Sequence, residues 1–570
     1  MRISTMTTPL SSNDIDTIEL RVRPFIKQMM QKKQITGLSV ALVDENGVLF
    51  AQGYGLADRH GKQPASPRTL YKIGSITKLF TGTAAMQLSE KGLLDIDKPV
   101  TEYLPEFSIQ CRPGELAQIT VRTLMTHHSG LPADCYRDYW SDDPHAFRKV
   151  LDFLKDFHLT FPPNTVFSYS NLATSLMGIL IERVSQLSYQ EYIERNILNP
   201  LGMQDSAATA QGASIALLSK AYSHGREVED PSFRDAPAGA IFSNGLDMAR
   251  FTAMVLANGY HQGITILQNK TLAEMLRPQN ANIQLDLGFR IGLNWLLSRP
   301  ALSHAGRVCW HDGGSPHFFS ILVALPDVQL GAVVLSNSDG GMVNVGLIAD
   351  EILKQALTAK IGRSAPSPAA PVAPARLEEN GQTESTTGTF ASASGIVRIF
   401  QRNGSLRAVL QGNQFSLIPA ADGWYSLRLL LFGLVPLKIA ALSSLRLALR
   451  WINGQKILGV EQYGMQAAFG MEYSPTPIPA AWSENLGVYR LVNGGKLPPF
   501  TSVHLVMDNG ILYLRAKARK IGKMSLVLKP VSVTEAVILG FGRSGGERIE
   551  LTDQDGVKMV RMTGLEFVKA

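Results

Sequence analysis

The stretch Gly74-Ser75-Ile76-Thr77-Lys78 is the point from which the rest of the 570-residue sequence can be interpreted. An apolar run with helical spacing follows it and stops at Gly92, which predicts a helix that begins at this stretch. Serine and lysine three positions apart share one face of a helix. An uncharged Lys78 there could accept the hydroxyl proton of Ser75, and the helix N-terminus favours developing negative charge. Alone, the pattern equally suits an N-cap serine followed by a solvated lysine.

Two motifs further along the chain carry side chains suited to the same chemistry. In Phe167-Ser168-Tyr169-Ser170-Asn171, a phenol and an amide stand at the predicted start of another helix. A phenol near a lysine can exchange a proton with it, and an amide can hold both a lysine and a substrate. In Trp310-His311-Asp312-Gly313-Gly314-Ser315-Pro316-His317, glycines precede an apolar strand, where backbone N–H groups can approach an oxyanion. Each motif alone is equally typical of a cap or a turn.

Apolar patterns outside these motifs predict an α/β (α+β) domain with an antiparallel sheet flanked by helices. They comprise an amphipathic helix, a hairpin, a second strand pair and a further helix, over residues 15–29, 38–52, 318–335 and 347–357. The hairpin turns at Asn46-Gly47, a dipeptide that suits a tight turn. The residues between the two strand pairs have mainly helical patterns. Strands from both ends of this region are therefore expected to form one sheet around a helical insertion.

The second half of the chain has a different pattern. Residues 361–378 are rich in proline, which cannot continue a helix, and are predicted to be a linker. Beyond them a strand-rich pattern occurs twice, beginning at Gly388 and Gly487, and each copy contains an Asn-Gly hairpin signal between alternating apolar runs. The predicted domains are therefore a first domain over residues 1–360, the linker, and two small antiparallel β-barrel-like domains over residues 379–478 and 479–570.

Together, and in this order, the three motifs resemble the active site of the serine β-lactamase-related family. That family includes class C β-lactamases, low-molecular-mass penicillin-binding proteins, D-aminopeptidases and family VIII esterases, with the motifs S-x-x-K, Y-x-N and K-T-G or H-x-G. The resemblance covers most of residues 20–358, with further matches at Leu124–Pro132, at Asn199–Met203, and at Ala238-Gly239 followed by Asp247. It implies a β-lactamase/transpeptidase-like fold for the first domain.

Carried over residue by residue, the resemblance implies that Ser75 is the nucleophile, Lys78 its general base and Tyr169 the proton carrier to the leaving group. The other site residues would orient the substrate or bind the oxyanion: Asn171, His311 and Gly313 in the first role, and the backbone N–H groups of Ser75 and Gly314 in the second. Whether Lys78 or Tyr169 accepts the first proton stays open, because closely coupled groups titrate as a unit.

His311 occupies the place where β-lactamases usually carry lysine. An imidazole is largely neutral near pH 7, so the site would lack a fixed positive charge for a substrate carboxylate. We therefore predict a metal-independent serine hydrolase that acts through an acyl-enzyme on a small ester or an amide or short-peptide substrate, as an esterase or an aminopeptidase does. The alternatives are a β-lactam-binding or β-lactam-hydrolysing protein of the penicillin-binding type, and a non-catalytic binding module.

Three other patterns are interpreted as unrelated to catalysis. Gly542-Arg543-Ser544-Gly545-Gly546 matches the G-x-S-x-G nucleophile elbow, but a strand pattern and no histidine follow it, so we interpret the match as accidental. His304-Ala305-Gly306 also matches H-x-G, but only the triplet at His311 leads directly into an apolar strand. His127 and His128 are predicted to shape a loop. No metal-binding spacing occurs, so neither a metal nor another cofactor is expected.

Bulk properties narrow the remaining choices. The chain is 45% hydrophobic and 18% charged, which is typical of folded domains rather than disorder. Its net charge of +7 is spread along the chain, so no nucleic-acid partner is predicted. With three cysteines, an acid-containing N-terminus and no apolar stretch longer than residues 429–437, which we interpret as a buried strand pair, we expect a cytoplasmic protein without a transmembrane segment. Homo-oligomerisation is left open.

Overall fold

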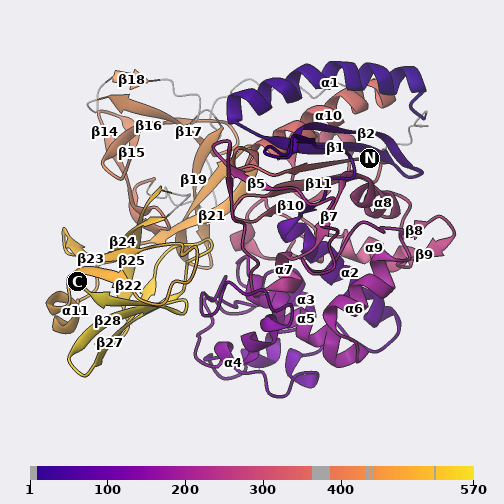
Figure 1. Cartoon of the computed structure of the whole chain (residues 1–570). Helices are drawn as coiled ribbons and strands as arrows, with labels where there is room; N and C mark the ends of the chain where they lie inside the picture. Colours follow the sequence, from indigo (N-terminus) through magenta and orange to yellow (C-terminus); the bar gives the residue numbers. More distant parts are fainter. Residues whose placement is uncertain (1–8, 363–385, 432–434, 438–441, 443, 519–521) are drawn as a thin grey trace.

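The structure is a computed structural model that describes residues 9–362, 386–431, 435–437, 442, 444–518 and 522–570. The predicted linker, residues 361–378, lies almost entirely outside the described residues, as do residues 379–385. The described chain comprises a region built on a mixed helix-and-sheet architecture, followed by two all-β bodies (Figure 1).

A six-stranded antiparallel sheet lies at the centre of the first region. In sheet order its strands are β10 (Cys309–Gly314), β11 (Phe319–Leu325), β12 (Leu330–Ser336), β1 (Gly37–Asp44), β2 (Gly47–Asp58) and β3 (Gln63–Pro64). β1 pairs with β12, with Leu38 opposite Ser336, so the two ends of the region meet in mid-sheet. This pairing confirms the predicted single antiparallel sheet.

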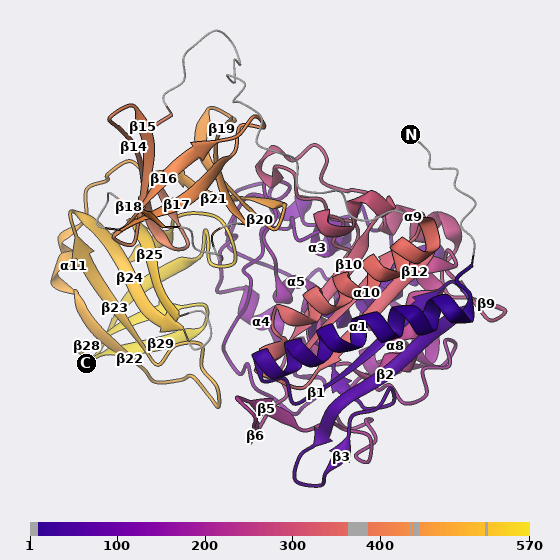
Figure 2. The same cartoon turned by 90° about the horizontal axis from the view of Figure 1, so that it is seen from above.

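Helices cover both faces of this sheet. α1 (Ser12–Lys33) and α10 (Asn344–Ile361) lie side by side on one face, and α8 (Gly245–Leu256) packs on the other (Figures 1 and 2). Every residue of β11 and β12 is therefore buried, which explains their continuous apolar sequences. The strand β10 forms one edge of the sheet.

The remaining helices form a subdomain beside α8. They are α2 (Thr77–Glu90), α3 (Val121–Met125), α4 (Val150–Leu154), α5 (Asn171–Ser185), α6 (Tyr189–Ile193), α7 (Ala236–Gly239) and α9 (Asn269–Met275). Three short strand pairs join this part: β4 (Tyr71–Lys72) with β7 (Phe242–Ser243), β5 (Ala221–Ser223) with β6 (Arg226–Val228), and β8 (Tyr260–His261) with β9 (Ile264–Thr265). α2 contacts α5, α6 and α7, and its residues from Thr77 to Leu88 are all buried. Its N-terminus therefore lies in the interior, close to β10.

Two antiparallel barrels follow. In the first, β16 pairs with β17, so that eight strands close into a ring and β18 pairs with β17 outside it. Its strands are β13 (Gly388–Ser392), β14 (Gly395–Arg402), β15 (Ser405–Leu410), β16 (Asn413–Pro419), β17 (Tyr425–Leu431), β18 (Val435–Leu437), β19 (Leu445–Ile452), β20 (Gln455–Gln462) and β21 (Met465–Glu472). After α11 (Ala480–Glu484), the second barrel closes through β22 (Gly487–Leu491), β23 (Ser502–Asp508), β24 (Ile511–Ala518), β25 (Gly522–Pro530), β26 (Glu535–Ile538), β27 (Arg548–Gln554), β28 (Val557–Met562) and β29 (Leu565–Lys569). Both barrels were predicted.

The repeated sequence pattern corresponds to repeated strand pairs. Asn403-Gly404 joins β14 to β15, and Asn509-Gly510 joins β23 to β24. All four residues have positive φ, between 50° and 74°, as two-residue hairpins of type I′ require. The stretch 429–437 falls on β17 and β18, which pair as predicted, although residues 432–434 lie outside the described part.

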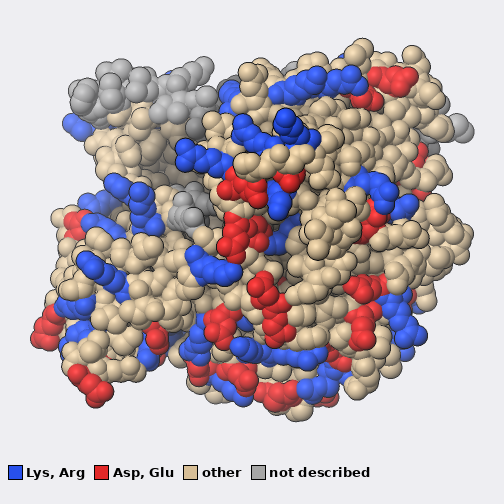
Figure 3. All heavy atoms as spheres, viewed as in Figure 1, with Lys and Arg blue, Asp and Glu red and all other residues tan. Residues whose placement is uncertain are grey.

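The barrels lie together against one side of the first region (Figures 1 and 2). Apolar side chains of the first region and of both barrels pack together in one cluster, which we call the interface cluster. It includes Phe161, Val166, Leu285, Leu287, Ile452, Ile457 and Phe541. The rings of Phe161 and Phe541 stack with centroids 5.8 Å apart. Acidic and basic side chains form separate small groups, both signs of charge being present, on the face shown in Figure 3. Within the described part of the chain, no helix has the length and apolarity needed to cross a membrane.

Candidate active site

The N-terminus of α2 brings Ser75 and Lys78 together. Ser75 lies in a 3₁₀ turn, Gly74–Ile76, and is partly exposed, whereas Lys78 on the first turn of α2 is fully buried. Lys78 Nζ donates to Asn171 Oδ1 and to the carbonyl oxygen of Ala238, both at 2.8 Å, and lies 3.3 Å from Ser75 Oγ. The amine therefore has the serine hydroxyl as a neighbour and two fixed acceptors that hold it in place.

The environment of Lys78 favours an uncharged amine. Burial lowers its pKa from 10.5 to about 7, and the cation of Arg543 acts in the same direction. The carboxylates of Asp134, Asp235 and Asp312 oppose this shift. Near neutral pH, a large fraction of Lys78 is consequently unprotonated and has a lone pair available for a proton.

Tyr169 lies close to both Lys78 and Ser75. Lys78 Nζ is 5.0 Å from the centroid of the Tyr169 ring, and the phenol forms a hydrogen bond with Ser75. Burial raises the pKa of Tyr169 above its ordinary value, so the phenol keeps its proton at neutral pH. The ring packs against His127, with centroids 4.4 Å apart.

The segment that carries Tyr169 and Asn171 is held by a neighbouring loop, residues 127–134. Ser170 caps α5 through a bond from the Ala173 N–H, and its hydroxyl donates to the Pro132 carbonyl. The Asn171 N–H donates to the Ala133 carbonyl at 2.8 Å. Because Ser170 is the N-cap of α5, the Asn171 side chain is not needed as a cap and instead accepts a hydrogen bond from Lys78.

β10 supplies the third motif. The glycine-containing segment before the predicted strand at Phe318 is an edge strand, and His311 on it is 2% exposed. Its Nδ1 donates to the carbonyl of Asp312, and burial lowers the pKa of His311 to about 4. The imidazole is therefore neutral at pH 7. His304, in the other H-x-G triplet, lies in a separate 3₁₀ helix, Pro300–Ala305.

Glycine lets β10 approach Ser75 closely. A Cβ atom on Gly313 would lie 1.9 Å from the carbonyl oxygen of Ile73, and one on Gly74 would lie 2.6 Å from the amide nitrogen of Gly314. Backbone therefore packs directly on backbone here, and the Gly314 amide lies next to the turn that carries Ser75. The predicted oxyanion-hole residues are neighbours in space.

The sequence did not predict two residues of the candidate site, Asp134 and Arg543. Arg543 extends from the loop between β26 and β27 of the second barrel, and its Nε and Nη2 donate to Asp134 Oδ2 at 2.8 and 2.6 Å. The guanidinium lies 5.8 Å from the Tyr169 ring centroid. The stretch 542–546 has no strand-to-helix elbow, as expected, but it does reach the active site. Arg543 is 409 residues from Asp134 in sequence, so no local motif predicts their contact. The one available signal was a single arginine in a glycine-rich loop, a pattern that suits a contact with another part of the chain.

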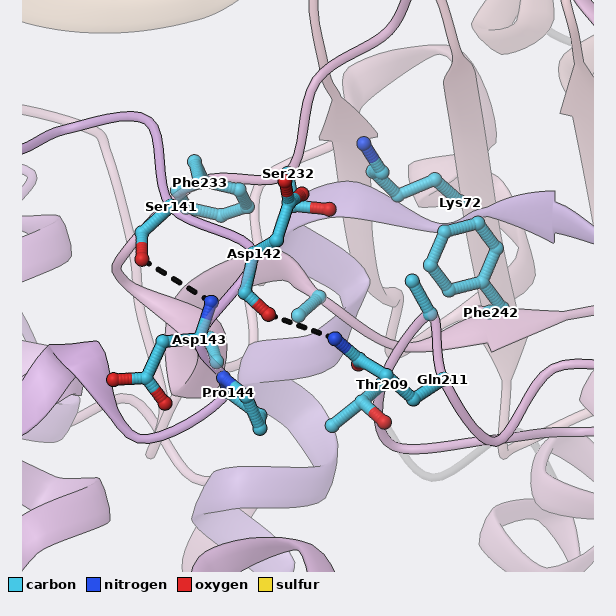
Figure 4. Close-up of a pocket in the computed structure, with 13 residues that line it drawn as sticks. Lys72, Ser141, Asp142, Asp143, Pro144, Thr209, Gln211, Ser232, Phe233 and Phe242 are labelled. Carbon is cyan, nitrogen blue, oxygen red and sulfur yellow. Dashed lines mark hydrogen bonds between the residues drawn. The ribbon is translucent and has the colours of Figure 1, made fainter.

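A pocket lies close to this site, since its lining residue Phe233 packs against Gly239, which itself lies next to Gly74. Its lining includes Lys72, Phe233, Phe242 and residues from 141–144 and 209–211 (Figure 4). The buried Lys72 pairs with Asp230 at 2.5 Å, and the second Asp230 oxygen accepts from Ser315 Oγ and from the His317 N–H. This ion pair therefore anchors the turn that follows β10.

The other groups that can bind metals or react as nucleophiles are dispersed. All three cysteines are free, and Cys135 and Cys309 are buried. Burial raises the pKa of Cys309 to about 12, which keeps it a thiol. Over the described ranges, no group of three or more His, Cys, Asp or Glu side chains is arranged to hold a metal ion. The absence of a metal stays a prediction.

Comparison of sequences places the first region in a known family. The family model described as Beta-lactamase matches residues 22–357. Protein flp of Staphylococcus aureus (strain NCTC 8325 / PS 47) is 27% identical over 334 residues, which cover 57% of this chain and 63% of flp. Penicillin-binding protein 4* of Bacillus subtilis (strain 168) is 25% identical over 329 residues, covering 54% and 69%. The chain thus spans less than two thirds of the length of flp.

Solved structures share the fold. The octameric penicillin-binding protein homologue from Pyrococcus abyssi covers 96% of this chain, with 99% of its own chain matched, a TM-score of 0.52 and 20% identity. SurE covers 80% of this chain, with 99% of its own chain matched, a TM-score of 0.57 and 19% identity. The family model extends over more than half of the sequence and includes all three motifs. The chain therefore belongs to the Beta-lactamase family.

Proposed function

We propose that the chain is a metal-independent serine hydrolase in which Ser75 attacks a small ester or amide substrate and holds its acyl group covalently. The observation that carries this proposal is the environment of Lys78: a fully buried amine, with a pKa near 7, lies 3.3 Å from Ser75 Oγ. Such an amine can accept the hydroxyl proton at neutral pH without an aqueous base.

The proposed reaction has two stages. Lys78 accepts the proton of Ser75 as Oγ bonds to the substrate carbonyl carbon, and the charge on the carbonyl oxygen is stabilised by the N–H groups of Ser75 and Gly314. Tyr169 then gives its proton to the leaving group as the scissile bond breaks, and takes back a proton from the Lys78 ammonium. Water repeats the sequence on the acyl-enzyme and releases the acid. The raised pKa of Tyr169 favours Lys78 as the first acceptor, because the phenol begins protonated.

The polar groups around the nucleophile support a substrate without a required carboxylate. His311 is neutral, so β10 offers no fixed cation, and the side chain of Asp312 on the same strand is 62% exposed at the edge of the sheet. An exposed carboxylate attracts an ammonium group. We therefore propose simple esters, or amides and short peptides with a free amine, as the substrate class.

A penicillin-binding protein that is acylated but turns over slowly is the second candidate, and the similarity to penicillin-binding protein 4* favours it. Such a protein would release one equivalent of leaving group and then stop.

We also propose a homo-oligomer, because the Pyrococcus relative is octameric by description. Light scattering of the purified chain would test that assembly.

The test is a substrate panel assayed with the wild type, Ser75→Ala and Ser544→Ala. The panel comprises 4-nitrophenyl esters, D- and L-amino-acid amides, short peptides and a cephalosporin. We expect multiple turnovers of an ester or an amine-bearing amide by the wild type and by Ser544→Ala, the serine of the G-x-S-x-G match, and none by Ser75→Ala. Unchanged rates in Ser75→Ala would refute the nucleophile, and comparable cephalosporin turnover would refute the substrate class.

A further inference from the structure

An unbroken chain of polar contacts connects the second barrel to the nucleophile. Arg543 donates to one oxygen of Asp134, and the other oxygen accepts from Asn171 Nδ2 at 2.8 Å. Asn171 Oδ1 in turn accepts from Lys78 Nζ at 2.8 Å, and Lys78 lies beside Ser75. Because the Asn171 amide donates to Asp134, its oxygen must face Lys78. The orientation of the general base, which lies on α2, is thus tied to a side chain of the second β-barrel.

The loop that carries Arg543 is firmly seated on the first region. A Cβ atom on Gly546 would lie 2.2 Å from the carbonyl oxygen of Thr160, so only glycine permits this approach. Phe541 belongs to the interface cluster and stacks on Phe161. The Tyr136 N–H donates to the Thr563 carbonyl at 2.8 Å, which adds a backbone bond next to Asp134. These contacts hold the guanidinium in one place relative to Asp134.

Asp134 differs from the other carboxylates that face Lys78. Asp235 has its own partner in Arg234, and both side chains are completely buried in the first region. Asp312 is exposed on β10, where water screens it. The remaining groups around the amine, Tyr169, His127 and His311, are held neutral by burial. The side chain of Asp134 is 4% exposed, and the cation that the described residues bring to it is Arg543 of the second barrel, whose side chain is 54% exposed but whose Nε and Nη2 lie 2.8 and 2.6 Å from the buried Asp134 oxygen. The buried carboxyl of Glu547, in the same loop as Arg543, also faces Asp134, and burial together with the Asp134 charge raises its pKa to about 8.

We propose that Arg543 is a positioning residue of the catalytic site, which balances the buried Asp134 carboxylate and so keeps Lys78 competent as a base. The inference rests on the proposed function of Ser75 and Lys78. Without Arg543, the Asp134 charge would stabilise the protonated amine across Asn171, and fewer molecules would have a free lone pair at neutral pH. Through Arg543, the second barrel therefore influences how readily Lys78 loses its proton.

The experiment compares the pH dependence of kcat/KM for Arg543→Gln, Asp134→Asn and the double variant, with 4-nitrophenyl acetate as the probe. Arg543→Gln should move the acidic limb to higher pH by about one unit, because a positive charge is lost and Asp134 is unbalanced. Asp134→Asn should move the limb to lower pH, because the charge that stabilises the ammonium is removed. The double variant should return close to the wild-type limb, and Arg543→Lys should stay near it because the charge is kept.

Arg515→Gln is the matched control, since Arg515 pairs with Asp508 at 2.6 Å inside the second barrel. It should leave the limb unmoved. Opposite shifts from the two single variants support the proposal, because a merely structural contact would lower the rate without moving the limb. An unmoved limb in Arg543→Gln, or shifts of the same sign in both variants, would overturn it. Failure of the proposed function is separate: there, Ser75→Ala would retain the wild-type rate.

Discussion

Lys78 is the residue on which the proposed chemistry depends, and its role was predicted from the family resemblance that the three motifs carry together. Positions 75, 78, 169, 171 and 311 could be predicted as site residues from sequence, because each lies in a short local motif. The pKa of Lys78 could not, because it arises from burial by α5, α7 and β10 and from the charges of Arg543 and Asp134, which the fold assembles. A short motif is therefore enough to find a candidate site residue, whereas its protonation state depends on the tertiary structure around it.

The lowered pKa of Lys78 predicts an acidic limb in kcat/KM close to pH 7. Below this pH the amine is protonated, so activity should fall about tenfold per pH unit. Lys78→Met should reduce kcat by about 10²- to 10⁴-fold at every pH. Initial rates in a series of buffers measure this, with the exposed Lys27→Met as the control. A flat profile between pH 5 and 8 would contradict the role of Lys78.

Stability should respond to the same group. Between pH 7 and 10.5, the unfolded chain binds a proton on Lys78 that the folded chain does not, so the lysine makes the folded state less stable as the pH falls through this window. Lys78→Met should therefore remove this part of the pH dependence. Thermal unfolding of both proteins at pH 7 and pH 10 is the measurement, and an unchanged pH dependence would count against a buried, neutral amine.

At the scale of elements, the fold was predictable where turns and apolar runs are local. The Asn-Gly hairpins of the two barrels and the paired strands β11 and β12 follow directly from sequence. The first hairpin was predicted one residue off: its turn is Glu45-Asn46, where Asn46 does not have positive φ, and Gly47 is already the first residue of β2. β10 was harder to predict as a strand, because an edge strand that ends in two glycines lacks an apolar pattern. Similarly, the cap of α5 is Ser170, which leaves Asn171 available to the site.

The close approach of β10 predicts that Gly313→Ala disrupts the site. The added methyl group would collide with the Ile73 carbonyl, so β10 must move away from Ser75. We expect a loss of about 1–3 kcal/mol in stability and a larger fractional loss of kcat than of binding. Gly245→Ala is the control, because its Cβ would meet Pro67 at an ordinary 3.5 Å. Equal activity of both variants would show that the contact does not position the oxyanion hole.

At the scale of the whole molecule, the sequence predicted two barrels but not their attachment. The interface cluster joins side chains from residues 161–166, 285–287, 452–457 and 541, and no local pattern connects them. The same holds for the loop 542–546, whose motif match was accidental and whose arginine is nonetheless in the site. Contacts between distant parts of the chain, rather than the elements themselves, were beyond sequence reasoning.

The interface cluster predicts that Phe541→Ala loosens the second barrel. Phe541 is 5% exposed and stacks on Phe161, so its removal should lower the free energy of unfolding by about 3 kcal/mol. The variant should also lose activity, because Arg543 lies two residues away. Limited proteolysis and thermal unfolding measure the change. Val557→Ala, at a 44% exposed site in the same barrel, should change stability by no more than about 0.5 kcal/mol.

The most direct test of the account is the mass of the intact protein during turnover. After rapid quenching of a reaction with 4-nitrophenyl acetate at pH 7, we predict a population heavier by one acetyl group, with the modification on the peptide that contains Ser75. Ser75→Ala should show no such adduct and no turnover above the uncatalysed rate. Hydrolysis that proceeds at the wild-type rate in Ser75→Ala, or an acetyl group found only on another residue, would contradict the account.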